Sequence, residues 1–391
     1  MIKLPDYVGP CAFGIKMGVV LPGSDLKKMV MEEVKKIDND GLLDDDDAIS
    51  VTESVLARAQ NNYVTTDDMA KEIREVLNIS EDSTVGVLFP ILSRNRFSMM
   101  MEGIAKAVPK GKVVVQLSYP DDEVGNQLIP EELAEKFDEE GRRIIPAKEL
   151  KEEDLLHPIT NVNYLQLYKD VIEKEGADYE IILSNDPMSM TEYDLDAAIS
   201  ADIHTREKNR KKLERKVKTC TLEDIFNDSS KDAWSEWGLL GSNMSSNNKL
   251  KLAPYDADKF ACELQEEIKS ETGKKVEILI SGDGAYKDPT SGIYELADPK
   301  PAFGTTPGLK ETFREGVKYK YLVDLYHNQG KSEEEIAEIL DKESKEKRSF
   351  DEIETEGTTP RQAQDLMASL ADLISGSADA GTPMILIKNL L

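Results

Sequence analysis

The chain has 391 residues, of which 76 are acidic and 49 are basic, so its formal net charge at pH 7 is −27. This excess of negative charge repels nucleic-acid backbones and anionic membranes over most of the surface, which favours a small-molecule partner. No apolar run approaches the ~20 residues that cross a bilayer, and the N-terminus lacks a basic start followed by an apolar core. We therefore expect a soluble, cytoplasmic protein that binds neither nucleic acid nor membrane.

A chain of this length buries a large core, and we expect two domains or one core with a large insertion. Its three cysteines and three histidines are scattered through the sequence and show no CxxC spacing. They indicate neither a disulfide framework nor a zinc site. Carboxylates remain as the groups from which a polar site is most easily built.

The first third of the chain predicts strands that alternate with helices. The predicted helices cover residues 25–37 and 67–77, capped by Ser24 and Thr66, and the predicted strands cover residues 48–52, 84–91 and 112–119. Glu53 stands where the first of these strands ends, which makes its side chain a candidate site group. The alternative is a solvated acidic turn followed by a surface glutamate.

A turn rich in arginine follows the second predicted strand. Residues 93–96 have the sequence Ser-Arg-Asn-Arg and lead into an amphipathic helical segment. The free backbone N–H groups at a helix start, with Arg94, Asn95 and Arg96 beside them, predict an anion site. The alternative is that both arginines pair with the many surface carboxylates.

Beyond residue 119 the composition changes to Glu, Lys and Asp at helical spacing. We interpret residues 120–176 as an insertion that packs on the core rather than as a separate catalytic unit. A strand is predicted at 179–183, and the basic run 206–218 follows it. Such a run attracts phosphate-bearing ligands through its local field, and a solvated helix face is the alternative.

Residues 278–304 gather several carboxylates in one stretch. The apolar run at 276–280 predicts a buried strand that delivers Asp283 into a turn flanked by glycines, where the backbone can approach a ligand closely. Further carboxylates follow in a loop-rich segment, at Asp288, Glu295 and Asp298. Oxygen ligands spaced this way suit Mg²⁺ or Mn²⁺ that holds phosphate oxygens. The alternative is that the Asp-Gly and Asp-Pro pairs only form turns.

The rest of the C-terminal part is mostly helical. A loop rich in Gly, Ser and Asn covers 234–248, and helices are predicted at 256–271, at 309–326, at 333–345 and from Thr359 and Pro360 to Gly376, before a closing strand at 383–387. The sequence contains no P-loop, no GxGxxG fingerprint after a strand and no GxSxG elbow. Acid–base chemistry by carboxylates around a metal ion remains.

Four segments share their order and local pattern with one known family. They are DDDDAISVTESVLARAQNNYV at 44–64, WGLLGSN at 237–243, ILISGDGAYKDP at 278–289 and RQAQDLMASLADLISGSADAGTPMILI at 361–387. In these segments the chain resembles the coenzyme F420-0:L-glutamate ligases, whose strand, glycine loop, Asp turn and closing helix occur in the same order. The matching pieces lie mainly in the N-terminal strands and from Trp237 onward.

The resemblance implies a two-domain α+β fold, the gamma-glutamyl-ligase-like fold with mixed sheets, which carries a helical insertion here. The implied bounds are an N-terminal part at 1–118, the insertion with connecting strands at 119–230 and a C-terminal part at 231–391. It also implies a homodimeric, GTP-dependent ligase that uses Mn²⁺ or Mg²⁺. Such an enzyme phosphorylates a small-molecule acceptor carboxylate, and the amine of L-glutamate then displaces the phosphate to form an amide.

The resemblance also implies roles for particular residues. Asp283 takes the place of a metal-binding and catalytic aspartate, and Glu53 lies in the N-terminal catalytic segment. The implied nucleotide-binding residues are Ser242 and Asn243 in the glycine loop and Arg361, and Gln362 is an implied metal ligand. The residues themselves add Arg94, Asn95 and Arg96 of the predicted anion site for the nucleotide and Asp288 of the acidic stretch for the metal.

Two departures from the family pattern bear on the substrate. The family loop normally has an acidic ligand where this chain has Leu240, so that ligand is missing or is supplied by Glu236 or Asp288. The Asp turn continues as AYKDP instead of an aromatic, arginine-rich sequence. Two alternatives follow, namely a non-catalytic metabolite- or nucleotide-binding protein of the same fold and a metal-dependent phosphohydrolase.

Overall fold

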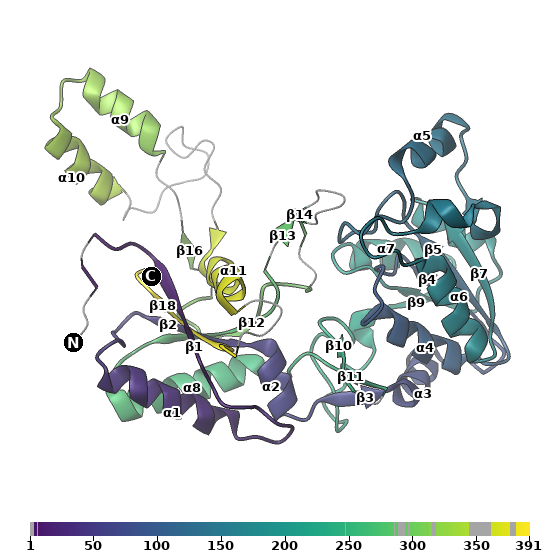
Figure 1. The fold of residues 1–391 in the computed structure, drawn as a ribbon, viewed down its shortest axis with the longest axis horizontal. Helices are drawn as coiled ribbons and strands as arrows, with labels where there is room; N and C mark the ends of the chain where they lie inside the picture. Colours follow the sequence, from purple (N-terminus) through teal and green to yellow (C-terminus); the bar gives the residue numbers. More distant parts are fainter. Residues whose placement is uncertain are drawn as a thin grey trace.

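The computed structural model describes residues 4–5, 7–246, 248–284, 286–287, 294–295, 298–310, 312–314, 318–343, 361–375 and 381–391. These residues form two lobes, each built on its own β-sheet, with a small sheet between them (Figure 1). The α+β class with mixed sheets, expected from the sequence, is confirmed. Among the described residues, no helix combines the length and the apolar character that crossing a bilayer requires.

The first lobe is built on a five-stranded mixed sheet. In spatial order its strands are β1 (Cys11–Ile15), β18 (Met384–Lys388), β2 (Ala48–Thr52), β12 (Glu277–Ser281) and β15 (Ala302–Thr305). β2 and β12 run parallel with Thr52 opposite Ser281, and the other neighbours are antiparallel. Because the carboxyl ends of parallel neighbours meet at one edge of a sheet, Glu53 and Asp283 emerge at the same edge.

Helices cover both faces of this sheet (Figure 1). α1 (Leu26–Asn39) and α8 (Ala257–Thr272) pack on one face and α11 (Ala363–Ser375) on the other, while α2 (Glu53–Ala59) continues from β2. In β12, Ile278 and Ile280 join the core under α1 and α8, and Leu279 joins the core under α11. This alternation is what a strand buried on both faces requires.

Two further helices form a hairpin that projects from the first lobe (Figure 1). They are α9 (Tyr319–Asn328) and α10 (Glu333–Glu343), which bury Leu322, Ile336 and Leu340 between them. The helix predicted at 309–326 is therefore too long, because residues 313–314 pair as a strand and the helix begins at Tyr319. The predicted end of α10 near residue 345 and the Thr359, Pro360 and Gly376 boundaries of the last helix lie outside the described residues.

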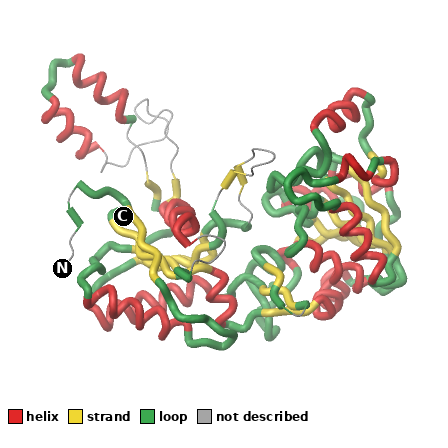
Figure 2. Tube along the Cα trace, in the orientation of Figure 1, coloured by secondary structure: helices red, strands yellow, loops and turns green. Residues whose placement is uncertain are grey.

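The second lobe is a doubly wound sheet with helices on both faces (Figure 2). In spatial order its strands are β6 (Ile145–Pro146), β7 (Asp178–Leu183), β5 (Lys112–Leu117), β4 (Thr84–Leu88), β8 (Ala197–Ser200) and β9 (Lys218–Thr221). All neighbours from β7 to β9 are parallel, and β6 pairs antiparallel with β7. The chain order of the strands reverses at β4, so the carboxyl ends of β4 and β8 form a topological switch point.

The helices of the second lobe divide between the two faces of its sheet. α3 (Thr66–Leu77), α4 (Phe97–Ala107) and α6 (Tyr164–Lys174) contribute to the large core on one face, and α7 (Arg206–Leu213) packs on the other. α5 (Glu131–Glu139) lies farther out, and 3₁₀ turns occur at η1 (Ala147–Glu149), η2 (Glu152–Leu155), η3 (Pro187–Glu192) and η4 (Leu222–Asp224). In the basic run at 206–218, Arg206 pairs with Glu223 and Arg210 pairs with Glu207.

The small sheet between the lobes consists of β10 (Asn243–Met244), β11 (Lys249–Lys251) and β3 (Tyr63–Thr65), all antiparallel. Two short hairpins complete the described strands, β13 (Tyr286–Lys287) with β14 (Tyr294–Glu295) and β16 (Phe313–Arg314) with β17 (Arg361–Gln362). The predicted domain bounds, 1–118, 119–230 and 231–391, do not coincide with the limits of the two large sheets. β4 and β5 lie at the centre of the second lobe, so residues 120–176 extend a sheet that begins at Thr84.

Two helix starts differ by one residue from the sequence expectation. Asp25, not Ser24, caps α1 by accepting a hydrogen bond from Lys28 N–H at 3.1 Å. Ser24 Oγ instead accepts from Leu21 N–H at 2.9 Å. α3 is capped by Thr65, whose side chain forms a capping box with Asp68, and not by Thr66. In both helices a neighbouring polar residue has the extended or turn backbone that a cap needs.

A carboxylate connects two loops at the carboxyl edge of the second sheet. Glu123 follows β5, and its side chain accepts hydrogen bonds from the N–H groups of Ile203 and His204, just after β8. Burial, and then the nearby charge of Asp202, raises the pKa of Glu123 to about 7, although its two backbone donors and the charge of His204 oppose that rise. The switch point is thus bridged by a carboxyl group that titrates near neutral pH.

The pKa of Glu123 predicts that stability decreases as pH rises. The folded-state pKa of about 7 exceeds the ordinary 4.5, so the folded state binds more protons between these values, and the stabilisation is lost as pH rises toward 7. Urea unfolding at pH 5 and pH 8 should show that Glu123→Gln removes about 1 to 3 kcal/mol of this pH dependence. The exposed Glu207→Gln is the control, and an unchanged pH dependence in Glu123→Gln would contradict the assignment.

Candidate functional site

A cavity of about 540 Å³ lies between the two lobes, at the carboxyl ends of β2 and β12. We call it the inter-lobe cavity. The first lobe contributes residues 52–54, 281–283 and the C-terminal part of α11, the second lobe contributes Asn95 and Arg96, and the small sheet contributes Asn243. Side chains from three separate parts of the chain therefore meet at one polar site.

Carboxylates dominate the first-lobe side of the cavity. Asp283 lies in the wall, and its N–H donates to the carboxylate of Asp298 beneath it at 2.8 Å. Asp372 of α11 also lines the cavity and accepts from Gly284 N–H at 3.0 Å. Burial, and then the charge of Asp298, raises the pKa of Asp283 to about 7, with Glu53 and Asp372 adding to the rise and Arg96 opposing it. The site carries more negative charge than its own cations balance.

Arg96 supplies a cation to this site. Its Nη2 lies 3.8 Å from the carboxylates of both Asp283 and Asp298. Its Nε and Nη2 donate to Asn243 Oδ1 at 3.3 and 3.1 Å. The guanidinium thus bridges the second lobe to the acidic turn of the first lobe.

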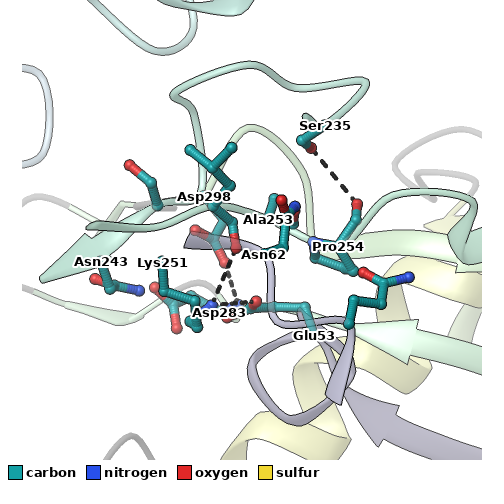
Figure 3. A network of polar contacts seen from close by, with 12 residues as sticks. Glu53, Asn62, Ser235, Asn243, Lys251, Ala253, Pro254, Asp283 and Asp298 are labelled. Atoms are coloured by element: carbon teal, nitrogen blue, oxygen red, sulfur yellow. Dashed lines mark hydrogen bonds and ion pairs between the residues drawn. The ribbon is translucent and has the colours of Figure 1, made fainter. Parts of the chain in front are cut away.

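Lys251 of β11 supplies a further cation, beside Glu53 (Figure 3). Its Nζ lies 3.0 Å from Glu53 Oε2, and both side chains are buried. Burial raises the pKa of Glu53, whereas the charge of Lys251 opposes the rise. The two charges of such a buried ion pair depend on each other energetically, because removal of either partner leaves the other charge buried alone.

Asn62 fixes the segment that follows Lys251. Its amide donates to the carbonyl oxygens of Trp234 and Ala253 at 2.7 and 2.8 Å, and its Oδ1 accepts from Trp234 N–H at 3.2 Å (Figure 3). Backbone groups from the glycine-rich loop and from the end of β11 are thereby joined through one buried side chain. This network holds Lys251 at the depth at which it meets Glu53.

The structure brings together five of the residues proposed from the sequence. Glu53, Asn95, Arg96, Asn243 and Asp283 all line the inter-lobe cavity. Glu53 is buried and ion-paired, so the surface-glutamate alternative is wrong. The alternative for Arg96 was that it pairs with surface carboxylates. It does pair with carboxylates, but they belong to the site residues Asp283 and Asp298.

Other proposed residues lie elsewhere. Ser242 is fully buried and its hydroxyl donates to Leu239 O at 2.6 Å, so its side chain stabilises the loop and does not line the inter-lobe cavity. Arg361 and Gln362 are exposed in β17, outside the cavity wall formed by the described residues. Arg94 lines a neighbouring cavity, and Asp288 lies outside the described residues.

Glu236 does not take the place of the acidic residue that the family loop normally has at the position of Leu240. Leu240 packs in the core of the second lobe, and the exposed Glu236 accepts a hydrogen bond from Asp256 N–H at 2.9 Å. The carboxylates next to Asp283 are instead Asp298 and Asp372. The suggestion that Glu236 replaces the missing ligand is therefore corrected.

Sequence reasoning missed Lys251, Asp372 and Ser375 as site residues. Lys251 alternates with Leu250 and Leu252, which is the usual pattern of a half-exposed strand and gives no hint of burial. Asp372 and Ser375 were detectable in principle, because they are polar positions at the C-terminal end of a helix whose other face is apolar. Arg361 and Gln362, which were proposed from the sequence, lie just before the N-terminal end of that helix.

Charged side chains of both signs that converge on a cavity between two lobes are typical of a site for a small polar ligand. A family model described as F420-0:Gamma-glutamyl ligase matches residues 14–389, nearly the whole chain. The chain belongs to this family of ligases, and the resemblance stated from its sequence is confirmed. A comparison with curated proteins gave no match.

Proposed function

We propose that the protein is a GTP-dependent ligase that joins L-glutamate, or a related amino acid, to an acceptor carboxylate through an acyl phosphate. The observation that carries this proposal is the convergence of Glu53, Asp283, Asp298 and Asp372 with Arg96 at the inter-lobe cavity. Phosphoryl transfer depends mainly on positioning and on neutralising the charge of the transferred group. Family membership supports the ligase chemistry.

A divalent ion fits the donor set at this cavity. Among the described residues, no three His, Cys, Asp or Glu side chains are grouped so that they alone could hold a metal. Mg²⁺ and Mn²⁺ in phosphoryl-transfer sites, however, take one or two carboxylates and leave positions to phosphate oxygens and water. Asp283 and Asp298 would hold such an ion, because their carboxylates adjoin each other and Asp283 N–H donates to the carboxylate of Asp298. The ion supplies charge neutralisation and orients the phosphate chain.

The proposed ligase reaction has two steps. An oxygen of the acceptor carboxylate attacks the γ-phosphorus of GTP, the bond to the β-phosphate oxygen breaks, and GDP leaves with the electron pair. The amine of L-glutamate then attacks the acyl carbon, inorganic phosphate leaves, and the amine proton passes to a carboxylate. Arg96 stabilises the charge that develops on the transferred phosphoryl group, and Glu53 is the carboxylate that receives the proton.

The test is a GDP-release assay from which one component at a time is omitted. We expect GDP release to require Mn²⁺ or Mg²⁺, an acceptor carboxylate and an amino acid together, and to be faster with GTP than with ATP. Phosphate release without any amino acid would instead favour a phosphohydrolase. A melting temperature raised by GTP without turnover would favour a binding protein that has lost the chemistry.

The homodimer belongs to the same proposal, and it derives from the family resemblance. Light scattering of the full chain at micromolar concentration measures its mass directly, and a single species of 43.7 kDa would contradict a dimer. The cytoplasmic location is likewise proposed from the composition of the chain.

A further inference from the structure

A second cavity, of about 560 Å³, adjoins the inter-lobe cavity on the side of the second lobe. We call it the distal cavity. The two cavities share Asn95, Arg96, Asn243 and Asp283 as lining residues, so they are contiguous. The distal cavity adds residues 91–94 and side chains of the loop after β5 and of α6. A ligand that extends from one cavity into the other would pass Arg96.

The distal cavity lies at the carboxyl edge of a parallel sheet. Its lining comes from the loop after β4, from the loop after β5 and from the first residue of α6, which all lie at that edge. Doubly wound sheets bind their ligands outside the carboxyl ends of their strands, which is the edge at which the distal cavity lies.

The charge in the distal cavity is unusual for this chain. Arg94 and Arg96 line it together with Asn126 and Tyr164, and Asp283, shared with the inter-lobe cavity, is its one carboxylate among the described residues. Arg94 forms no ion pair with a described carboxylate, although acidic residues outnumber basic ones by 76 to 49. Burial raises the pKa of Tyr164, whereas the charge of Arg94 acts on the same hydroxyl and lowers it. An arginine left unneutralised beside a tyrosine hydroxyl is a recognition element for an anion.

The loop that carries Arg94 is held by buried groups of the second lobe. Asp122 accepts hydrogen bonds from the N–H groups of Leu92, Val124 and Asn126 at 2.7, 3.0 and 2.8 Å and from Asn126 Nδ2 at 2.9 Å. Tyr168 Oη donates to Ile91 O at 2.5 Å and accepts from Ser93 N–H at 3.1 Å. Both side chains are buried. The cavity is therefore preorganised, which lowers the entropy lost on binding.

We propose that the distal cavity binds an anionic group of the acceptor, a phosphate or a second carboxylate, through Arg94, Asn126 and Tyr164. The reacting carboxylate of the acceptor then reaches past Arg96 to the nucleotide in the inter-lobe cavity. The assignment of the anion to the acceptor rests on the proposed ligase function. The anion site itself rests on the cavity, its charge and its scaffold. These residues lie in the segment 91–164, so specificity for the acceptor resides in the second lobe.

Calorimetric titration with inorganic phosphate, and separately with succinate, tests the site and distinguishes the two kinds of anion. We expect wild-type protein to bind one of them, and Arg94→Ala to weaken that binding about tenfold or more because a charge-assisted hydrogen bond is lost. Tyr164→Phe should weaken it less. Arg142→Ala, which removes an equal charge paired with Glu149 on the surface, is the matched control and should leave binding unchanged. Equal binding by Arg94→Ala and wild type would overturn the proposal.

Competition with GTP separates this proposal from the ligase proposal. Saturating GTP with Mn²⁺ should leave phosphate or succinate binding within about twofold, and Arg94→Ala should leave GTP affinity within the same range, because the two ligands occupy different cavities. Displacement of the anion by GTP would overturn the distal site as an acceptor subsite. Anion binding that depends on Arg94 in a protein that binds no GTP would retain the anion site and remove the ligase function.

Discussion

The variant Asp283→Asn is expected to release GDP about 10²- to 10³-fold more slowly than wild type, because one of the two carboxylates that would hold the divalent ion is lost. The same change should leave the melting temperature unchanged or raise it. Burial, together with the nearby charges of Asp298, Glu53 and Asp372, raises the pKa of Asp283 to about 7. Neutralising it removes like-charge repulsion within the folded protein.

This opposite response of activity and stability separates a catalytic carboxylate from a structural one. The rate is measured by coupled GDP release and the stability by thermal unfolding of the same preparation. Asp67→Asn is the matched control, since Asp67 is an exposed partner of Lys106 far from either cavity, and it should change neither quantity. Full activity in Asp283→Asn would remove this residue from the site.

The second large effect concerns the ion pair between Lys251 and Glu53. Lys251→Met should lower the free energy of unfolding by about 3 to 5 kcal/mol, because it leaves the Glu53 carboxylate buried without its cation. The double variant Glu53→Gln with Lys251→Met should recover most of this loss. Urea unfolding of the wild type, both single variants and the double variant forms the required cycle.

A surface lysine provides the comparison for this cycle. Lys110→Met breaks the exposed pair with Glu81 and should leave the free energy of unfolding close to that of the wild type. If Lys251→Met changed the free energy of unfolding as little as Lys110→Met does, and if it showed no coupling to Glu53→Gln, the charges of Lys251 and Glu53 would be solvated and not buried together.

Local sequence patterns were sufficient for the strands that deliver the site. The apolar runs before Glu53 and Asp283 correctly predicted β2 and β12, and the parallel pairing of these two strands brings both carboxylates to one sheet edge. A pattern of apolar residues shows that a strand is buried, but it does not show which sheet the strand joins. For this reason β4 and β5 were assigned to the N-terminal part of the core and not to the second lobe.

The rest of the site depends on contacts between distant parts of the chain. Lys251 and Glu53 are separated by 198 positions, and no local pattern links them. In the sequence, Asp298 is one of several carboxylates in the same stretch. What distinguishes it is the hydrogen bond that its side chain accepts from Asp283 N–H, which forms only in the folded turn. The distal cavity shows the same limit, since the arginine turn was recognised but the buried Asp122 and Tyr168 that hold it were not.

Calorimetric titration of GTP into the wild-type protein, with and without Mn²⁺, tests most directly whether the inter-lobe carboxylates serve a metal-bound nucleotide. We expect Mn²⁺ to raise the affinity for GTP about tenfold or more, equivalent to at least about 1.4 kcal/mol. Equal affinity for GTP with and without Mn²⁺ would contradict the role assigned to Asp283 and Asp298.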